Sequence, residues 1–544
     1  MGTTKPRPSG KASLAAAQTL PERTFIIDNG AYTMKAGYAP DSITEDETEA
    51  LSACSVISNA LVKTRDNRVY VGSQLGTHVT DWNELMFRRP VEKGYTVNWE
   101  AQKEIWEHSF FDEKTVRSKD LRIAKPEETT LVLTEAPNAL PALQKNADEI
   151  VMEEWGFGGY LRCVGPSLNA WNEVQSLFGD PIVQKYDSAV SPRECLLVVD
   201  SGYSHTTVTP LYKGQPLQRA IRRLDLGGKH LTNYLKEMVS MRQYNMVDEA
   251  YIINEVKEAV CYVSDDFARD MEQTWKGNRK RGQFDPDEGV TVDYVLPDPN
   301  GSKKGFMRPH DPLLNAKKRK SALSGATAEA LSEDVLVLSN ERFTVPEILF
   351  NPSDIGMKQA GITDMILQSL SVLPTGLHPA FLANVLVVGG NSLIAGFMER
   401  LEKELREVAS AECAVRVRQP QDSIRSTWLG ASRLATNKDE MKKVAITRQE
   451  YQENGHKYVR IVAREFAQGV AAFPTGQEIA LLMQICLPSL KWLGFSDGRG
   501  VSIVVRWWNS YSAVITLHAD AAHSSGKTSP VYKFDMAHAN DAQL

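Results

Sequence analysis

Two segments of the chain share one pattern, an apolar run that ends in Asp and is followed by Gly. In the first, Thr24 to Asp28 precedes Asn29-Gly30, and in the second, Cys195 to Asp200 precedes Ser201-Gly202. Asn-Gly after an apolar run predicts a tight hairpin turn whose two central residues have positive φ. Each segment therefore predicts a buried strand that turns back antiparallel, and the repetition suggests two related halves.

A third apolar run, Val385 to Val388, ends in Gly389-Gly390 and leads into a helical pattern from Ile394 to Val408. Other segments with apolar residues at helical spacing lie between the strands, for example Val247 to Val263. Strands that alternate with helices indicate the α/β class. At 544 residues the chain is far longer than one small domain, so we expect two or more domains.

Composition excludes several classes of protein. A net charge of −6 gives no overall indication that the protein binds nucleic acid directly. The six cysteines form no CxxC pair, which argues against a zinc site or a disulfide scaffold and favours a reducing compartment. No run reaches the ~18 apolar residues of a membrane helix. We therefore expect an intracellular soluble protein that does not contact a membrane.

Three regions differ in composition from the rest of the chain. Residues 1–23 are polar and small and predict a disordered arm. The segment from Trp275 to Asp334 is rich in Lys, Arg, Gly and Pro and predicts a mostly flexible insertion, with one strand near Tyr294 to Leu296. No function is assigned to the C-terminal part. Two strands are predicted there, over Val501 to Val505 and Ala513 to Leu517.

The glycine turns have a chemical meaning of their own. Glycine after a buried strand lets backbone amides approach an anion closely, and two such hairpins facing each other suit a polyphosphate. Asp28 and Asp200 suit a hydrated Mg²⁺, which prefers carboxylate and water oxygens, and Lys35 adds a positive charge. Gly389-Gly390 allows close approach to an adenine or a ribose. Any one of these motifs alone is more often an ordinary turn that connects two strands and binds no ligand. Three of them after three apolar runs favour a nucleotide site.

The motifs and their order resemble the actin family. Phe25 to Ala39 is similar to the family's first phosphate hairpin, and Leu197 to Pro210 is similar to the second. The resemblance runs from Phe25 to about Gly455 and is interrupted by the insertion. Five further motifs follow in family order: Arg223 to Leu235, Val256 to Val263, Asn340 to Phe343, Val388 to Gly390 and Ile446 to Tyr451.

This resemblance implies the two-lobed actin-like fold of the Hsp70, hexokinase and actin superfamily, with duplicated sheet-and-helix halves and an ATP cleft between the lobes. It also implies a division of the chain. Residues 1–23 form the arm, 24–198 lobe one, 199–430 lobe two with the insertion 275–334, 431–456 a return to lobe one, and 457–544 a C-terminal extension.

The resemblance further implies which residues contact the nucleotide, with Mg²⁺ held through water by Asp28 and Asp200. The implied contacts are Asp28, Gly30, Lys35, Asp200, Gly202, Gly228, Lys257, Glu258, Gly389 and Gly390.

Several positions depart from the family pattern. Ala31 replaces a phosphate-binding Ser, Tyr203 replaces a second carboxylate, and Asn254 replaces an Arg. Glu149 stands where the family uses a Gln to orient the attacking water, and Thr207 stands where it uses a His. Loss of the second carboxylate weakens the case for Mg²⁺. We therefore expect ATP as a structural ligand, at most very slow hydrolysis, no catalytic residue and no enzyme.

Two further motifs distinguish a branch of the family. Arg89 to Trp99 and Asp293 to Asp298 most resemble the actin-related protein 6 subfamily of nuclear actin-related proteins. That resemblance implies a structural subunit of an SWR-type chromatin-remodelling complex, which supports exchange of a variant histone into nucleosomes. The implied partners are the motor chain and a zinc-finger subunit, with histones or the nucleosome reached indirectly. The short loop from Ala60 to Tyr70 argues against filament formation.

A basic cluster within the insertion, Lys317-Lys318-Arg319-Lys320, is a candidate nuclear import signal. A solvated charge run is the commoner meaning of such a cluster, but the family resemblance favours import. We therefore expect a nuclear protein with a cytoplasmic pool.

Two rival functions belong to other classes. The first is an actin-like ATPase or filament-forming protein, and the second is a sugar kinase or chaperone ATPase of the same superfamily. Phosphate release and sedimentation under polymerising salt distinguish the first rival. The order of the motifs argues against the second.

Overall fold

The computed structural model describes most of the chain. None of the helices in the described residues is both long and apolar enough to span a membrane. The described ranges are 19–43, 47–79, 85–174, 176–178, 194–276, 279–280, 283–284, 290–297, 304–311, 334–468 and four strands between 491 and 538.

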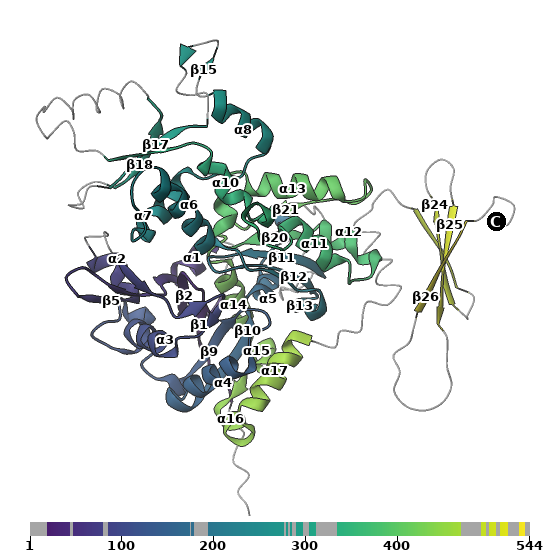
Figure 1. Ribbon diagram of the computed structural model, residues 1–544. Coiled ribbons are helices and arrows are strands. Elements are labelled where there is room, and N and C mark those ends of the chain that lie inside the picture. The colour runs from purple at the N-terminus through teal and green to yellow at the C-terminus, as the bar shows by residue number, and fades with distance from the viewer. Residues whose placement is uncertain are drawn as a thin grey trace, which may run out of the picture.

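Two six-stranded sheets form the centres of two lobes, the lower and upper halves of the body in Figure 1. The first sheet has the order β22-β10-β9-β1-β2-β3, and the second has the order β13-β12-β11-β20-β21, with β14 paired to β12. The strands of the first sheet are β1 (Arg23–Asn29), β2 (Thr33–Tyr38), β3 (Ser55–Ser58), β9 (Thr129–Glu135), β10 (Gly159–Val164) and β22 (Ile446–Thr447). Those of the second are β11 (Cys195–Ser201), β12 (Thr206–Tyr212), β13 (Gln215–Pro216), β14 (Arg222–Leu224), β20 (Val385–Val388) and β21 (Val417–Arg418).

The two sheets repeat one arrangement, which confirms the prediction of two related halves. In the first, β1 pairs antiparallel with β2 and parallel with β9. In the second, β11 pairs antiparallel with β12 and parallel with β20. The Asp of each motif therefore lies at the carboxyl end of the central strand of its sheet, beside a parallel neighbour.

Alternation along β1 explains how the first sheet is covered on both faces, because successive side chains of a strand point to opposite sides. Phe25 and Ile27 pack against α3, α4, α16 and α17, whereas Ile26 packs with Trp428 on the side of α5, α14 and α15. The helices of this lobe are α1 (Glu47–Ser52), α2 (Leu75–His78), α3 (Trp99–Trp106), α4 (Pro141–Glu149), α5 (Gly165–Leu168), α14 (Ser426–Thr436), α15 (Lys438–Val444), α16 (Arg448–Asn454) and α17 (His456–Gln468).

The second sheet is covered in the same way. Leu197 and Val199 of β11 face the helices of lobe two, whereas Leu196 and Val198 pack against Ala170, Val174 and Phe178 of the chain that enters from lobe one. The helices of this lobe are α6 (Gly228–Arg242), α7 (Ala250–Val260), α8 (Phe267–Lys276), α10 (Glu341–Glu347), α11 (Ile362–Leu370), α12 (His378–Leu382) and α13 (Phe397–Val408).

The sheets correct the expected lobe boundaries. A division at residue 198 would cut β11, so lobe two includes all of Cys195–Ser201. The return to lobe one begins at Ser426 rather than 431, because the whole of α14 packs beside β1. It also continues beyond 456, because Val459 of α17 is buried in the core of lobe one.

The first hairpin is confirmed, but its expected turn is wrong. Asn29 still belongs to β1, so the connection to β2 consists of Gly30, Ala31 and Tyr32. Neither Asn29 nor Gly30 is among the residues with positive φ. Gly30 is required for a different reason, since a Cβ there would lie 2.5 Å from the carbonyl oxygen of Thr33.

The described parts of the segment 275–334 are partly built into lobe two. β17 (Val292–Val295) pairs with β18 (Phe306–Pro309) on one side and with β19 (Val335–Leu338) on the other. The strand predicted near Tyr294 is thus confirmed, and Tyr294 is buried in the core of lobe two. Removing 275–334 as a unit would therefore take two strands from this sheet. The strands β15 (Arg279–Lys280) and β16 (Gln283–Phe284) form a separate pair.

Two smaller features match their predictions. The short loop between Ala60 and Tyr70 is a hairpin of β4 (Leu61–Lys63) and β5 (Val69–Val71), and β6 (Met86–Arg88) flanks β4. Near the C-terminus, the two predicted strands are present in an antiparallel sheet of four. Its strands are β23 (Lys491–Ser496), β24 (Gly500–Arg506), β25 (Ser512–Ala519) and β26 (Tyr532–His538).

We expect Tyr294→Ala to destabilise the protein by roughly 3–5 kcal/mol, the usual cost of truncating a buried aromatic side chain. Thermal denaturation followed by circular dichroism measures the effect. Tyr244→Ala is the matched control, because that tyrosine is 41% exposed. Equal melting temperatures for the two variants would show that the segment around β17 does not contribute to the core.

Candidate nucleotide cleft

Asp28 lies at the end of β1, where two neighbouring strands supply its partners. Thr134 of the parallel strand β9 donates its hydroxyl to Asp28 Oδ1 at 2.7 Å. Lys35, opposite Asp28 in the β1–β2 register, places Nζ 3.7 Å from Asp28 Oδ2. Both side chains of this ion pair are mostly shielded from solvent. Asp28 is therefore already neutralised within its own lobe.

Asp200 occupies the equivalent position in lobe two but has a different environment. Its pKa is raised to about 7, chiefly by burial and also by the nearby charge of Asp28, while Lys35 acts in the opposite direction. The two hairpins thus bring Asp28, Lys35 and Asp200 close enough to interact across the lobes, as the sequence predicted. One lysine faces two carboxyl groups.

The predicted glycines of lobe two converge beside Asp200. Gly389 has a φ of 92°, and a Cβ there would lie 2.4 Å from the carbonyl oxygen of Ser201 and 2.9 Å from Asp200 Oδ1. The amide of Gly228 donates to the carbonyl oxygen of Gly202 at 3.0 Å. These glycines therefore allow close packing of backbone against backbone. Gly390 differs, since a Cβ there would meet no atom within 4 Å.

The two predicted residues on α7 belong to an internal network. Lys257 is buried, which lowers its pKa, and its Nζ donates to Asn254 Oδ1 at 2.8 Å and to Thr232 Oγ1 at 3.1 Å. Glu258 is exposed and accepts a hydrogen bond from Asn254 Nδ2 at 2.8 Å. Asn254 therefore links the two charged side chains in place of the Arg that the family pattern leads one to expect.

Sequence reasoning missed Tyr32, which with Tyr203 occupies the space between the two hairpin tips. The ring centroids lie 4.8 Å apart with an interplanar angle of 40°. Asn254 Nδ2 of lobe two lies 3.4 Å from the Tyr32 hydroxyl oxygen, and burial raises the pKa of Tyr32 to about 12. The signal was present in the sequence, because in both hairpins a Tyr follows the motif Gly by one or two positions.

Comparison with known proteins assigns the chain to a family. Residues 19–466 match the family model described as Actin. The chain belongs to the actin family.

Several actin-family relatives share most of their length with this chain. A protein of Aspergillus fumigatus named Actin-like protein arp6 is 79% identical, over 84% of this chain and 97% of its own length. Its namesake in Emericella nidulans is 76% identical, over 84% and 98%. Actin-related protein 6 of Drosophila melanogaster is 33% identical, over 79% and 97%. These matches confirm both the actin-like fold and the branch of the family that the motifs indicated.

One residue carried over from the actin pattern was placed wrongly. Glu149 ends α4 on the surface, where its carboxylate is 3.1 Å from Lys145 Nζ, and it is not beside the hairpins. Gly165, directly after β10, lies there instead, since a Cβ on it would be 4.0 Å from Asp28 Oδ1. Thr207 does lie opposite Asp200 in the β11–β12 register, but its hydroxyl cannot replace an imidazole as a base.

The residues at the hairpin tips do not fit a magnesium polyphosphate. Phosphates between the tips would have to displace the contact between Tyr32 and Tyr203. Lys35 is already paired with Asp28, and Ala31 offers no hydroxyl. Among the described residues, no group of three or more His, Cys, Asp or Glu is placed to hold a metal ion. The glycines of the actin-family pattern are thus retained, whereas Tyr32 and Tyr203 occupy the place between the hairpin tips where the resemblance implies phosphates.

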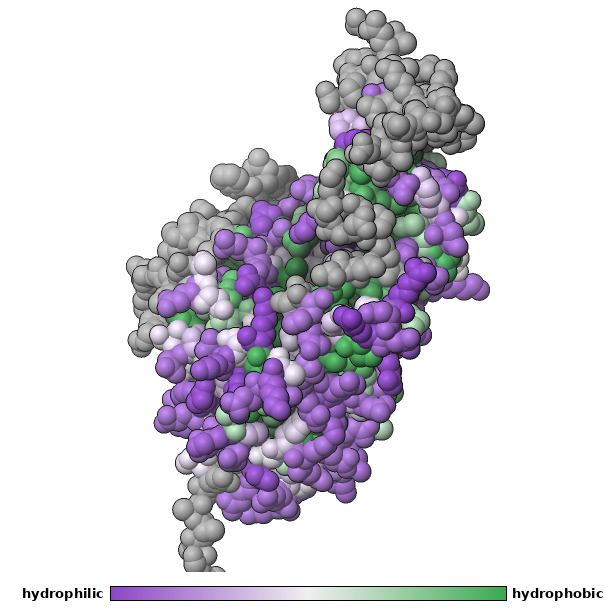
Figure 2. Space-filling model, turned by 90° about the vertical axis from the view of Figure 1, so that its left-hand side faces the viewer, coloured by the Kyte–Doolittle hydropathy of each residue, from purple (hydrophilic) through white to green (hydrophobic). Residues whose placement is uncertain are grey.

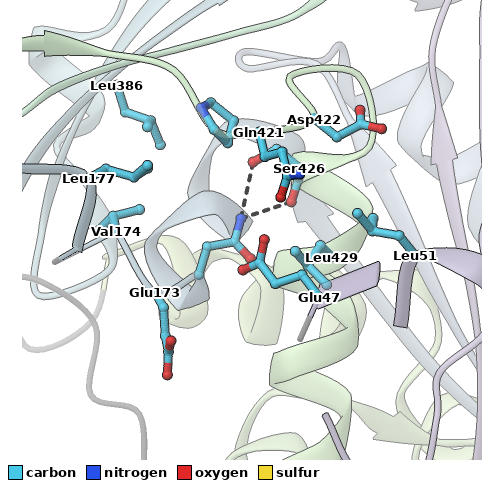
Figure 3. A pocket seen from close by; sticks show the side chains of 12 residues that line it. Glu47, Leu51, Glu173, Val174, Leu177, Leu386, Gln421, Asp422, Ser426 and Leu429 are labelled. Atoms are coloured by element: carbon cyan, nitrogen blue, oxygen red, sulfur yellow. Dashed lines mark hydrogen bonds between the residues drawn. The ribbon is translucent and has the colours of Figure 1, made fainter. Parts of the chain in front are cut away.

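A separate cavity of about 270 Å³ is drawn in Figure 3. Asn172 donates to the carbonyl oxygen and the hydroxyl of Ser426 at its edge, at 2.9 and 3.1 Å. None of the predicted nucleotide contacts lines it. Its other lining residues are Glu47, Leu51, Glu173, Val174, Leu177, Leu386, Pro420, Gln421, Asp422 and Leu429.

The pKa of Asp200 generates a pH prediction. Because the pKa is raised in the folded protein, the folded state binds the proton more tightly than the unfolded chain. The stability that this provides is complete below about pH 4 and is lost as the pH rises through 7. Asp200→Asn, which stays neutral, should therefore melt roughly 2–4 °C above the wild type at pH 8 and by clearly less than that at pH 5.

Differential scanning fluorimetry across this pH range measures the difference. Asp41→Asn, a change at an exposed carboxylate, is the control for general charge effects. An Asp200→Asn difference of the same size at pH 5 and pH 8 would contradict the assigned proton.

Proposed function

We propose that this chain is a structural, non-enzymatic subunit of a nuclear SWR-type chromatin-remodelling complex that supports exchange of a variant histone into nucleosomes. The observation that carries the proposal is the similarity, 79% and 76% over nearly the whole length of two fungal relatives, to proteins named Actin-like protein arp6. The proposed partners are the motor chain and a zinc-finger subunit, and histones are reached through the complex. A nuclear location with a cytoplasmic pool follows from this role.

The cleft supports a role without catalysis. Thr207 supplies no base, Glu149 lies on the outer surface, and Tyr32 and Tyr203 fill the space between the hairpin tips. ATP as a structural ligand, which the family resemblance implied, is not needed for this role. A protein without catalytic residues in its cleft can still serve a complex by presenting fixed surfaces to the other subunits.

The hairpin β4–β5 supports a role outside filaments. Its connection is closed by a hydrogen bond from the Thr64 amide to the carbonyl oxygen of Arg68 at 2.9 Å, with Asn67 at a φ of 62°. This tight turn leaves no extended loop that could reach a neighbouring copy. In the space-filling view of Figure 2, hydrophilic residues predominate and hydrophobic ones appear as small patches between them. The coloured, described part of that face therefore gives no support to self-assembly through a broad apolar surface.

Complementation tests the proposed function. In an Emericella nidulans strain lacking its Actin-like protein arp6, this chain should restore the variant histone in chromatin and co-purify with the remodeller's motor chain. Chromatin immunoprecipitation and affinity purification are the two measurements. Full expression without either result would overturn the proposal.

The import candidate Lys317-Lys318-Arg319-Lys320 lies outside the described residues and is tested in the same strain. Alanine at all four positions should lower the nuclear fraction of a fluorescent fusion several-fold, because import receptors bind clustered positive charge. Alanine at Lys442 and Lys443, an exposed basic pair on α15, is the control. Equal nuclear fractions for both variants would reject the cluster as a signal.

The alternative, an actin-like ATPase or filament former, makes the opposite prediction. We expect phosphate release no faster than that of a buffer blank and no pelleting under polymerising salt. Malachite-green phosphate assay and sedimentation measure these, with muscle actin as the positive control. Sustained release or pelleting would favour the alternative.

A further inference from the structure

Arg89 lies over both aromatic rings at the hairpin tips. Its guanidinium carbon is 4.4 Å from the ring centroid of Tyr32 and 5.2 Å from that of Tyr203. Its Nη1 donates to the carbonyl oxygen of Tyr32 at 3.0 Å and to that of Asn59 at 3.4 Å. A cation within ~6 Å of an aromatic face is attracted to it. One side chain of lobe one thus contacts the tips of both hairpins.

The short hairpin that follows Arg89 also contacts lobe two. Its strands are β7 (Val91–Glu92) and β8 (Tyr95–Thr96), joined by Lys93 and Gly94 at φ values of 50° and 79°. A Cβ on Gly94 would lie 2.3 Å from the ring of His205, so only glycine allows this approach.

Three charged contacts surround that approach. Lys229 of α6 places Nζ 2.8 Å from Glu92 Oε2. Arg223 of β14 donates to the carbonyl oxygen of Lys93 at 2.6 Å, and its guanidinium carbon is 5.0 Å from the ring centroid of Tyr95. The β7–β8 hairpin is therefore fastened to lobe two through the residues on both sides of its turn.

A second aromatic contact crosses between the lobes near the same place. Phe87 of β6 stacks on Tyr251 of α7, with ring centroids 6.3 Å apart and planes 6° apart. Tyr251 is one turn before Asn254, which contacts the Tyr32 hydroxyl. The lobes are thus joined by side chains from Phe87 to Tyr95, a short stretch that includes most of the subfamily motif.

We propose that Arg89, Tyr32, Tyr203 and the β7–β8 hairpin form an interlobe clasp that holds the cleft closed without a nucleotide. A nucleotide at the site that the family resemblance implies would have to lie between these same two hairpins. Here the cation of Arg89 and the two aromatic rings occupy the space between the tips. This inference stands apart from the proposed chromatin function, because it concerns the isolated chain.

The first test is the nucleotide content and response of the purified full-length protein. After denaturation, chromatography should detect no ATP or ADP at a stoichiometric level. Adding ATP with Mg²⁺ at millimolar concentration should shift the melting temperature by less than roughly 1 °C, because a ligand that does not bind the folded state cannot stabilise it. Near-stoichiometric nucleotide, or a shift of several degrees, would overturn the proposal.

The second test compares neighbouring arginines by hydrogen–deuterium exchange. Arg89→Ala should raise amide exchange on the order of 10-fold at the tips, over residues 30–34 and 202–206, because local opening exposes those amides. Arg88→Ala removes the same charge from a side chain that is 56% exposed and pairs with Glu100. It should leave both tips unchanged. Equal exchange in the two variants would contradict the clasp.

A third variant keeps the proposal testable if Arg89→Ala does not fold. Tyr203→Phe retains the ring and should exchange like the wild type, whereas Tyr203→Ala should open both tips. The complementation assay measures chromatin function in cells, and these tests measure nucleotide and exchange in the isolated protein. A failure of the clasp is therefore distinguishable from a failure of the proposed function.

Discussion

Two carboxyl groups at the ends of facing strands determine the electrostatics of the cleft between the lobes. Asp28 lies close enough to Asp200 to raise the pKa of that group, in a setting where burial penalises ions. Lys35 neutralises Asp28 at 3.7 Å, which leaves Asp200 to be accommodated mainly by its raised pKa. A polyphosphate would add negative charge to a space in which Lys35 is paired with Asp28 and Arg89 is held against two aromatic rings. The carboxyl groups at the hairpin tips are therefore accommodated by contacts within the protein.

The duplicated sheets explain why these carboxyl groups meet. Each lobe places an Asp where a central strand ends beside a parallel neighbour, and each hairpin turns away at that edge. Two such edges facing each other create a shared space that a ligand, water or side chains can occupy, because the backbone groups there need hydrogen-bond partners. Within this constraint the identity of the tip residues decides the function of the cleft. Small tip residues leave room for a ligand, whereas Tyr32 and Tyr203 fill the space themselves.

Sequence reasoning found what depends on local pattern. Apolar runs ending in Asp-x-Gly predicted both hairpins, the α/β class and the duplication, and most of the predicted cleft residues lie together. It failed where the outcome depends on contacts between distant segments. Glu149 was placed by analogy along the chain, yet a helix directs it to the surface. The segment 275–334 looked flexible by composition, although its strand at Tyr294 pairs with β18 of the same segment and with β19, which follows the segment.

The motif from Arg89 to Trp99 shows how a subfamily signature can have a mechanical basis. In the sequence this motif indicated a branch of the family. In the structure its residues contact lobe two at His205, Arg223 and Lys229. A nucleotide joins lobes reversibly, since its binding and hydrolysis change the contacts. Side chains of the same polypeptide cannot leave, so a clasp built from them fixes one arrangement of the lobes. A subunit that presents constant surfaces to an assembly benefits from such a fixed body, and an enzyme that cycles between open and closed states would not.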